Sequence, residues 1–456
     1  MLNNVYDENY DVVIAGGGVS GSVAAIAASR SNAKTLVIEQ SGYLGGALTS
    51  CGVGPMMTFY AGEKQIIKGI MQEIVAEMVL RGYSPGHVKD TTQYINYLTP
   101  FDSEGLKNVL DTMVERAGCD VLLHTFIGNV STQDNKITSL TICNKDGLNN
   151  ISGKVFIDAT GDGDIATWAG ARMLKGRETD GAMQPMTMNM KYSNVDPNRI
   201  RKYITDHSEE FPRMKNNIEL MHQTTRLSFA GFAKEFKEAQ KLGELDMKRE
   251  EILCFETNTL REFIVNTTRI IDHDSTNAIS LSNAERVGRK QCHQLDMFLK
   301  KYIPGFENAV LESTGPSIGI RGSRQLVGKH TLSAQEVMER KEFESVVAHS
   351  SYPIDIHNPK GEGTASTFIS TPGTYYSIPY EVMVCDEVSN LLVTGRCVSA
   401  SFEAQAAIRT TPTVGALGHA CGVAAAMAAQ TDTDTRKVNC KELQKKLKIQ
   451  NAYLDI

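Results

Sequence analysis

The chain lacks several features that would mark other protein classes. Its nine cysteines contain no C-x-x-C pair, which excludes the usual ligand spacing of iron–sulfur clusters and a redox-active disulfide of that spacing. An odd number of scattered cysteines is typical of a reducing cytoplasm. The formal net charge is −6 and no basic run stands out, which argues against a nucleic-acid-binding surface.

Segments for export, membrane insertion and metal binding are also missing. No apolar stretch approaches the roughly 20 residues of a membrane span, and no signal-peptide pattern precedes the first expected strand at Tyr10. No metal-ligand motif, repeat or low-complexity segment is present. We therefore expect a cytoplasmic protein without a metal site or a membrane span. With 456 residues the chain can bury a large core, and we expect two closely linked domains.

A glycine turn between two short apolar segments is the most informative positive feature. Residues 10–15 are mainly apolar and β-branched, and they lead into Gly16–Gly21, which has the pattern G-x-G-x-x-G. A helix of small residues is expected at 22–28, and a second strand at 35–38 ends at Glu39. A strand, a glycine turn, a helix and an acidic residue in this order are the fingerprint of a dinucleotide-binding fold.

The residue types in this fingerprint have distinct physical roles. Gly16 permits a tight turn, and Gly18 lets backbone amides approach a pyrophosphate at the positive end of the helix. Gly21 lets the helix pack closely on the strand. Glu39 would accept hydrogen bonds from an adenosine ribose, and its charge would repel the 2′-phosphate of NADP. An ordinary glycine turn is the alternative for a motif this short.

Later glycine segments favour FAD over other dinucleotides. Gly45 and Gly46 follow the second strand, where a glycine pair lets the backbone lie against the ribityl and flavin groups. A strand pattern at 154–158 runs into Ala-Thr-Gly-Asp, and another at 390–394 ends at Gly395. Three strand ends that carry glycine, in this order, predict FAD as the cofactor.

A long helix of small residues near the end of the chain supports the same cofactor. Pro412 lies where proline is favoured, in the first turn of a helix expected to include 414–430. Gly415, Gly418 and Gly422 keep one face of that helix thin. A flavin could then lie near the helix N-terminus, where the dipole favours negative charge on its N1–C2=O region.

In these segments the chain resembles the FAD-dependent oxidoreductases of the glutathione-reductase-like superfamily with two dinucleotide-binding folds. Within it, the chain is most similar to the bacterial FAD-dependent oxidoreductase family, which is distantly related to fumarate reductase and succinate dehydrogenase flavoproteins. The matching stretches are Gly16–Gly21, Gly45–Ser50, Asp158–Asp164, Gly319–Arg324, Asp355–Pro359 and Gly395–Gly422. The resemblance implies an α/β fold in which a Rossmann-like FAD/NAD(P)-binding domain carries an inserted α+β substrate domain.

The motifs and the resemblance together define a set of expected FAD contacts. The loop after the second glycine pair offers Thr49, Ser50 and Cys51 instead of the histidine that carries covalent FAD in some relatives, so we expect dissociable FAD. The resemblance also implies that the backbone near Ile127 contacts adenine. The expected cofactor-binding residues are Gly16, Gly18, Val19, Ser20, Gly21, Glu39, Gln40, Gly45, Gly46, Ala47, Thr49, Ile127, Thr160, Gly161, Asp162, Gly395, Arg396, Arg409, Pro412 and Thr413.

The order of the motifs divides the chain into two expected domains. Residues 1–171 and 385–456 carry the FAD motifs and should form one discontinuous domain. Residues 172–384 lie between these motifs and should form a substrate or cap domain. The substrate should therefore lie between the two domains, against the flavin.

Candidate catalytic residues follow from flavin chemistry, which pairs hydride transfer with movement of a proton. His357 lies in a polar segment just before the chain returns to the FAD domain, and Asp355 could orient its imidazole. A turn-forming role for residues 355–359 is the alternative. Arg321 is the second candidate because arginine binds carboxylates bidentately, and arginine is the proton donor in fumarate-reductase-like relatives. For Arg324 the alternative is an interdomain salt bridge.

Three functional hypotheses remain open from the sequence. The first is FAD-dependent dehydrogenation of a small polar substrate such as a sugar, polyol or hydroxy acid. The second is reduction of an activated C=C bond with an external reductant, and the third is a flavin subunit that passes electrons within a complex. The substrate, the electron donor or acceptor, and the existence of a homo-oligomer are not determined by the sequence.

Overall fold

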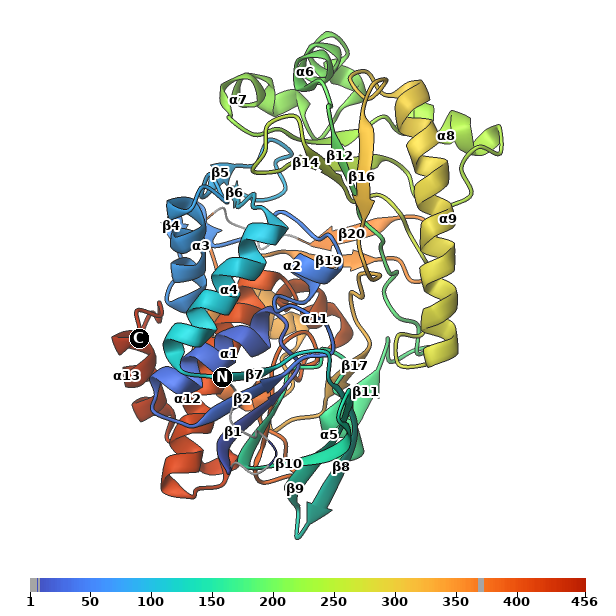
Figure 1. Cartoon of the computed structure of the whole chain (residues 1–456). Helices are drawn as coiled ribbons and strands as arrows, with labels where there is room; N and C mark the ends of the chain where they lie inside the picture. The colour runs from blue at the N-terminus through green and yellow to red at the C-terminus, as the bar shows by residue number, and fades with distance from the viewer. Residues whose placement is uncertain (1–5, 7–8, 368–372) are drawn as a thin grey trace.

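The computed structural model describes residues 6, 9–367 and 373–456 and consists of two layered regions (Figure 1). One region, here called the nucleotide-binding half, is built on a seven-stranded sheet. The other, here called the cap, is built on a five-stranded antiparallel sheet and lies above the first in Figure 1. The expected α/β fold, with a Rossmann-like domain and an inserted substrate-side region, is confirmed by this topology.

The seven-stranded sheet has a parallel part and an antiparallel extension. The order β7-β2-β1-β10-β22 is parallel, and the N-terminal part of the long strand β10 continues into antiparallel pairing with β9 and β8. The parallel core is apolar and largely β-branched, as expected for strands covered on both faces. The strands are β1 (Tyr10–Ala15), β2 (Thr35–Ile38), β7 (Asp120–Leu122), β8 (Phe126–Gln133), β9 (Lys136–Asn144), β10 (Gly147–Asp158) and β22 (Leu391–Val393).

Two helices of small residues pack against each other over this sheet. They are α1 (Val19–Arg30) and α12 (Thr411–Thr431), and both are almost wholly buried. A methyl group placed on Gly418 would lie 2.2 Å from the carbonyl oxygen of Ser20, and one on Gly422 would lie 2.2 Å from that of Ala24. The glycines that sequence analysis noted are therefore required for the close approach of the two helices.

Helix α12 corrects one expectation from the sequence. An 18-residue window of this 21-residue helix has a mean hydropathy of 1.2, so by length and composition the helix could cross a membrane. The structure buries 89% of that window inside the fold. The helix is apolar all round because it packs on both sides, as in the core of a large protein.

Further helices belong to the nucleotide-binding half. Helix α4 (Ser103–Ala117) is capped by Asp102, whose side chain accepts a hydrogen bond from the backbone N–H of Glu104, and Gly118 in the left-handed conformation follows its last residue. The remaining helices of this half are α2 (Ala47–Ser50), α3 (Ile70–Leu80), α5 (Asp164–Trp168), α10 (Ala334–Glu339), α11 (Phe402–Ile408) and α13 (Cys440–Ile449).

The cap has a hydrophobic core of its own. Its sheet has the order β13-β14-β15-β12-β16, and the long helix α9 lies along it (Figure 1). Aromatic and methionine side chains between 188 and 309 fill the space between sheet and helices. The elements are β12 (Met190–Ser193), α6 (Pro197–Asp206), α7 (Ile218–Gln223), β13 (Ser228–Gly231), α8 (Ala233–Lys241), β14 (Ile252–Glu256), β15 (Phe263–Val265), α9 (Ala278–Tyr302) and β16 (Val310–Thr314).

The hydrophobic cores bear on the expected domain boundary. The apolar side chains of Leu332, Val347, Ile378 and Val384 belong to the same core as α1 and α12, although the sequence places them in the expected cap segment 172–384. The core of the cap spans only residues 188–309. A division into 1–171 with 385–456 and 172–384 therefore remains a proposal, and the cores favour a shorter cap.

Five small two-stranded sheets complete the described fold. The hairpin of β19 (Ile354–His357) and β20 (Thr364–Thr367) lies near α11 and below the cap sheet in Figure 1. The remaining pairs are β3 (Tyr60–Ala61) with β4 (Lys64–Gln65), β5 (Val88–Lys89) with β6 (Tyr97–Leu98), β11 (Met173–Lys175) with β17 (Arg324–Leu326), and β18 (Val346–Ser350) with β21 (Tyr376–Pro379).

Candidate active site

The first glycine turn has the geometry that the sequence predicted. Gly16 has a φ of +101°, and a methyl group there would lie 2.6 Å from the carbonyl oxygen of Ala159. A methyl group on Gly21 would lie 1.9 Å from the carbonyl oxygen of Gly16. The tight turn at Gly16 and the close packing at Gly21 are thus confirmed, because no larger side chain fits either position.

The second glycine pair lies against the start of α1. Gly45 forms a bridge with Gly18, and a methyl group on Gly46 would come within 2.7 Å of the Gly18 Cα. The helix begins at Val19 without a side chain that caps its first N–H groups, so the amides of Val19 and Ser20 remain at its positive end. These features fit the pyrophosphate of a dinucleotide, which backbone amides of this kind bind.

Glu39 lies at the end of β2, beside the same turn. Its buried carboxylate accepts hydrogen bonds from the backbone N–H groups of Gly17 at 2.7 Å and Ser41 at 2.8 Å, while the adjacent Gln40 is exposed. The two carboxylate oxygens can accept further hydrogen bonds, so Glu39 could still accept one from a ribose hydroxyl. Ile127 lies at the start of β8, two residues after Thr125, whose N–H donates to the carbonyl oxygen of Glu39.

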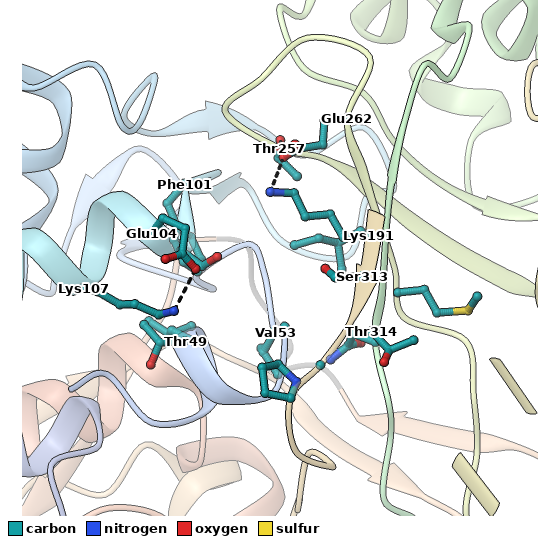
Figure 2. A pocket seen from close by; sticks show the side chains of 18 residues that line it. Thr49, Val53, Phe101, Glu104, Lys107, Lys191, Thr257, Glu262, Ser313 and Thr314 are labelled. Carbon is teal, nitrogen blue, oxygen red and sulfur yellow. Dashed lines mark hydrogen bonds and ion pairs between the residues drawn. The ribbon is translucent and has the colours of Figure 1, made fainter. Parts of the chain in front are cut away.

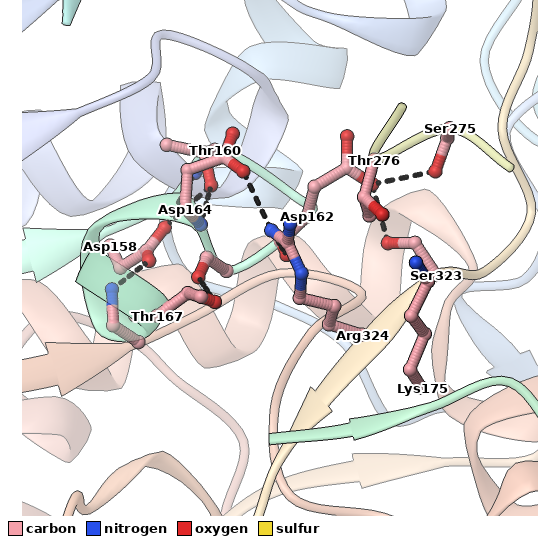
Figure 3. A network of polar contacts seen from close by, with 12 residues as sticks. Asp158, Thr160, Asp162, Asp164, Thr167, Lys175, Ser275, Thr276, Ser323 and Arg324 are labelled. Atoms are coloured by element: carbon pink, nitrogen blue, oxygen red, sulfur yellow. Dashed lines mark hydrogen bonds and ion pairs between the residues drawn. The ribbon is translucent and has the colours of Figure 1, made fainter. Parts of the chain in front are cut away.

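The second strand end, after β10, is a network of polar contacts (Figure 3). Asp158 is fully buried and accepts hydrogen bonds from the backbone N–H groups of Thr160 and Ala166. Burial raises the pKa of Asp158 to about 6 despite these bonds. Gly161 has a φ of +82°, so the loop turns sharply there and brings Asp162 toward the cap side.

Asp162 is the centre of a junction between distant segments. Its carboxylate pairs with the Arg396 guanidinium at 2.8 Å and accepts hydrogen bonds from the hydroxyls of Ser275 and Ser323. Arg396 was expected to contact FAD, but in this structure its guanidinium contacts Asp162 and Ser323. The neighbouring Arg324 pairs with Asp164 at 2.8 Å, so it forms a salt bridge, and the interdomain character of that bridge stays a prediction (Figure 3).

The third strand end comes close to the first. Gly395 has a φ of +92° and lies beside Ser20, whose hydroxyl is 2.7 Å from that of Thr394. Three glycine-bearing strand ends therefore meet around the start of α1. Pro412 lies in the first turn of α12, and the Thr413 hydroxyl donates to Ser350 at 2.9 Å. The residues present fit a bound FAD, although the individual contacts remain predictions.

His357 and Asp355 lie together on β19. Alternate residues of a strand share a face, and His357 Nε2 is 3.2 Å from Asp355 Oδ2. The turn-forming alternative is wrong for these two residues because Ile354–His357 are paired in a strand. Asp355 also lies 3.4 Å from the Tyr352 hydroxyl, so the carboxylate is held in place from a second direction.

Arg321 lies within range of the charges of Arg249, Arg269 and Arg409, and these four residues form a group here called the arginine cluster. Arg409 Nη2 is 3.5 Å from Asp355 Oδ2, so its side chain lies toward β19 instead of along the glycine turns. Arg321 donates to the carbonyl oxygen of Pro185 at 2.6 Å. The sequence singled out Arg321 and Arg409, whereas Arg249 was missed because it lies in a charged stretch with no motif.

Charge in the arginine cluster displaces several pKa values. Burial, and then the charge of Arg321, lowers the pKa of His357 to about 3, so its imidazole is neutral at neutral pH. His357 and Arg409 hold the pKa of the Asp355 carboxyl far below its usual range despite burial. Burial and the neighbouring arginines lower the pKa of Arg321 well below its ordinary value. Arg321 is therefore a stronger acid than a solvated arginine.

A cavity of about 190 Å³ lies where α4 of the nucleotide-binding half faces the cap sheet (Figure 2). Thr49, an expected FAD contact, lies on its wall, and its hydroxyl donates to the carbonyl oxygen of Leu44 at 2.8 Å. Ala47 begins the same short helix α2. Ion pairs of Lys107 with Glu104 and of Lys191 with Glu262 line the opposite sides of the cavity (Figure 2).

Comparisons with known proteins agree with this cofactor assignment. A family model described as FAD dependent oxidoreductase matches residues 11–447. Two curated relatives, the digeranylgeranylglycerophospholipid reductases of Thermoplasma volcanium and Thermoplasma acidophilum, are each 24% identical over 218 residues. Each match covers 43% of this chain, and it spans only half the length of the relative.

Two solved structures of low sequence identity are similar to this chain. A geranylgeranyl bacteriochlorophyll reductase-like protein from Thermoplasma acidophilum is 15% identical, with a TM-score of 0.48 over 97% of this chain and 83% of the other. The flavin-dependent brominase Bmp2 is 13% identical, with a TM-score of 0.48 over 97% of this chain and 84% of the other.

Proposed function

Because the chain belongs to the FAD dependent oxidoreductase family, it is an FAD-dependent oxidoreductase, and we propose that it reduces an activated C=C bond. The observation that carries this proposal is the cluster of His357, Asp355, Arg321 and Arg409 at the junction of β19 and the start of α12. When bound, FAD supplies hydride transfer at its N5 atom. The chain itself must bind the substrate and move a proton.

The arginine cluster suits the charge that develops during such a reduction. Addition of a hydride to one alkene carbon drives electron density onto an electron-withdrawing substituent, and positive groups held in place stabilise that density. A proton must then reach the neighbouring carbon. Arg321, with its lowered pKa, is the candidate donor, and His357, held by Asp355, is the candidate relay. An external reductant of two electrons is needed to regenerate the reduced cofactor.

The named relatives support reduction of a C=C bond but not their own substrate. They are reductases of a geranylgeranyl lipid by name. The side chains around His357 are arginine, aspartate and tyrosine, and such a lining is a poor environment for an isoprenoid chain because buried charges favour polar partners. The proposal is therefore a small, polar, activated alkene.

Dehydrogenation of a small hydroxy acid is the second candidate. It is favoured by one observation: Asp355 Oδ2 lies 3.2 Å from His357 Nε2, so the carboxylate could orient an imidazole that accepts the hydroxyl proton during oxidation. The same arginines would hold the acid group. The two candidates differ in the direction of electron flow. An alkene would oxidise the reduced flavin, whereas a hydroxy acid would reduce the oxidised flavin.

An anaerobic stopped-flow experiment separates the candidates. The FAD-loaded protein, reduced with dithionite, is mixed with fumarate, crotonate or crotonamide, and the oxidised protein is mixed with lactate or malate, while flavin absorbance is followed. We expect an alkene to reoxidise the flavin. His357→Asn should slow that phase about a hundredfold, as for loss of a general acid or base. If the hydroxy acids bleach the oxidised flavin and the alkenes do not reoxidise the reduced flavin, the proposal is wrong and dehydrogenation takes its place.

A further inference from the structure

The segment 184–189, directly before β12 of the cap, holds three buried polar side chains with an atom that lacks a hydrogen-bond partner. Gln184, Thr187 and Asn189 are 2%, 4% and 3% exposed. In the part of the chain that the structure describes, no partner meets Gln184 Oε1, the Thr187 hydroxyl or Asn189 Oδ1. A buried polar atom without a partner is costly, so three of them within six residues point to a ligand that meets them.

The neighbours of the two amides determine which of their atoms is left free. Asn189 Nδ2 donates to the carbonyl oxygen of Cys51 at 3.0 Å. Gln184 Nε2 donates to Gln405 Oε1 at 3.1 Å, and Gln405 Nε2 donates to backbone carbonyl oxygens. A flip of either amide would bring two acceptors together. The free atoms of Gln184 and Asn189 are therefore acceptors, whereas the Thr187 hydroxyl can donate or accept.

The same contacts place this segment beside two of the glycine-bearing segments. Cys51 directly follows α2, the short helix that begins after the second glycine pair. Gln405 lies on α11, and its Nε2 donates to the carbonyl oxygen of Arg396 at 3.3 Å, next to Gly395 at the third strand end. Segment 184–189 therefore contacts both of the glycine-bearing segments beside which the flavin ring is expected to lie.

We propose that Gln184, Thr187 and Asn189 bind the polar edge of the flavin ring of FAD and favour its reduced form. The oxidised ring has one N–H group, at N3, and carbonyl oxygens at C2 and C4, whereas reduction adds an N–H group at N5. Two acceptors and a hydroxyl therefore suit the reduced ring better than the oxidised one. Tighter binding of the reduced form raises the midpoint potential of the bound cofactor.

Thr187→Val tests the contact because it removes the hydroxyl and keeps the shape of the side chain. Since that hydroxyl has no partner among the described residues, the apoprotein should unfold at a urea concentration no lower than the wild type does. FAD affinity should fall about threefold to tenfold in a titration of the apoprotein, as for loss of one hydrogen bond.

Thr268→Val is the matched control for this test. Thr268 is 2% exposed, and its hydroxyl accepts from the backbone N–H of Met188 at 2.8 Å and donates to the carbonyl oxygen of Met188 at 2.9 Å. The control variant should therefore unfold at lower urea concentration and bind FAD as the wild type does. If Thr187→Val keeps wild-type affinity for FAD, or loses as much stability as Thr268→Val, the proposal is wrong.

The midpoint potential of the FAD-loaded protein tests the preference for the reduced form. Gln184→Leu and Asn189→Leu each remove one acceptor, and each should reduce that preference about tenfold, which lowers the potential by about 30 mV for a two-electron couple. Gln184→Leu keeps the contact between segment 184–189 and Cys51, so it serves even if Asn189→Leu folds poorly. A wild-type potential in Gln184→Leu would overturn the proposal. None of these measurements needs turnover of an alkene, so they are independent of the proposed function.

Discussion

The glycine turns and the arginine cluster are two parts of one candidate site, yet they are built on different physical principles. Around Gly16 and Gly21 the constraint is steric: backbone atoms approach so closely that a methyl group does not fit. Around Asp355 the constraint is electrostatic: side chains from distant segments bring charge together. Steric constraints of the first kind are local in sequence and leave a motif. Charge clusters of the second kind leave none.

The largest expected effect tests the steric region. Gly21→Ala places a methyl group 1.9 Å from the Gly16 carbonyl oxygen, so the backbone must move, at a cost of about 3 kcal/mol or more. We expect this variant to unfold at lower urea concentration and to lose FAD. Gly128→Ala is the matched control, because the nearest atom to its methyl group is 4.0 Å away. Equal midpoints for the two variants would refute the steric account.

Glu39 combines the two kinds of constraint, because its charged carboxylate accepts hydrogen bonds from the backbone beside the glycine turn. Glu39→Gln removes the charge but keeps an oxygen that can accept from Gly17 or Ser41. FAD affinity should fall roughly tenfold to a hundredfold, with a small loss of stability. Titration of the apoprotein with FAD measures this. Glu73→Gln, at an exposed ion pair with Arg30, should retain wild-type affinity.

Replacement of Glu39 by alanine is a less specific test of ribose binding than replacement by glutamine. The structure shows a buried backbone N–H of Gly17 and a partly buried one of Ser41 bonded to this carboxylate. Loss of both acceptor oxygens leaves these N–H groups unpaired, so the alanine variant should also be less stable.

The remaining expected effect is a change of slope in stability with pH, and it is small per pH unit. The pKa of His357 is about 3 in the fold and near 6.5 in the unfolded chain, so between these values only the unfolded chain binds the proton. The free energy of unfolding should therefore fall as the pH is lowered from about 6.5 toward 3. His357→Asn should reduce that slope by up to one proton, about 1.4 kcal/mol per pH unit. Urea unfolding of the apoprotein at several pH values measures it.

Other histidines provide the control for this slope. Burial lowers the pKa of His87, His349 and His419 to about 4, so they contribute with the same sign as His357. His419→Asn should flatten the slope without any effect on binding of organic acids, since its ring contacts Gln450 and not the arginine cluster. A slope that His357→Asn leaves unchanged would mean that the imidazole is already protonated in the fold.

Much of the nucleotide-binding half was predictable because its signals are local. The first two strands lie where the sequence placed them, and the acidic residue follows the second strand directly. The contact of Asp355 with His357 was also predictable, because residues two apart on a strand share a face. The domain boundary stays a prediction, and Leu332, Val347, Ile378 and Val384 join the first core through packing that leaves no mark in a linear pattern.

The cofactor class and the fold could be read from the linear sequence, because short-range steric needs restrict specific positions to glycine, proline or an acidic residue. Which charges meet became known only from the folded chain. Folding paired Arg396 with Asp162, turned Arg409 toward Asp355, and added Arg249 to a cluster that no spacing indicated. Coulombic interactions depend on distance in space and not on separation along the chain, so their arrangement emerges only when the hairpin of β19 and β20 is placed between the cap and the nucleotide-binding half.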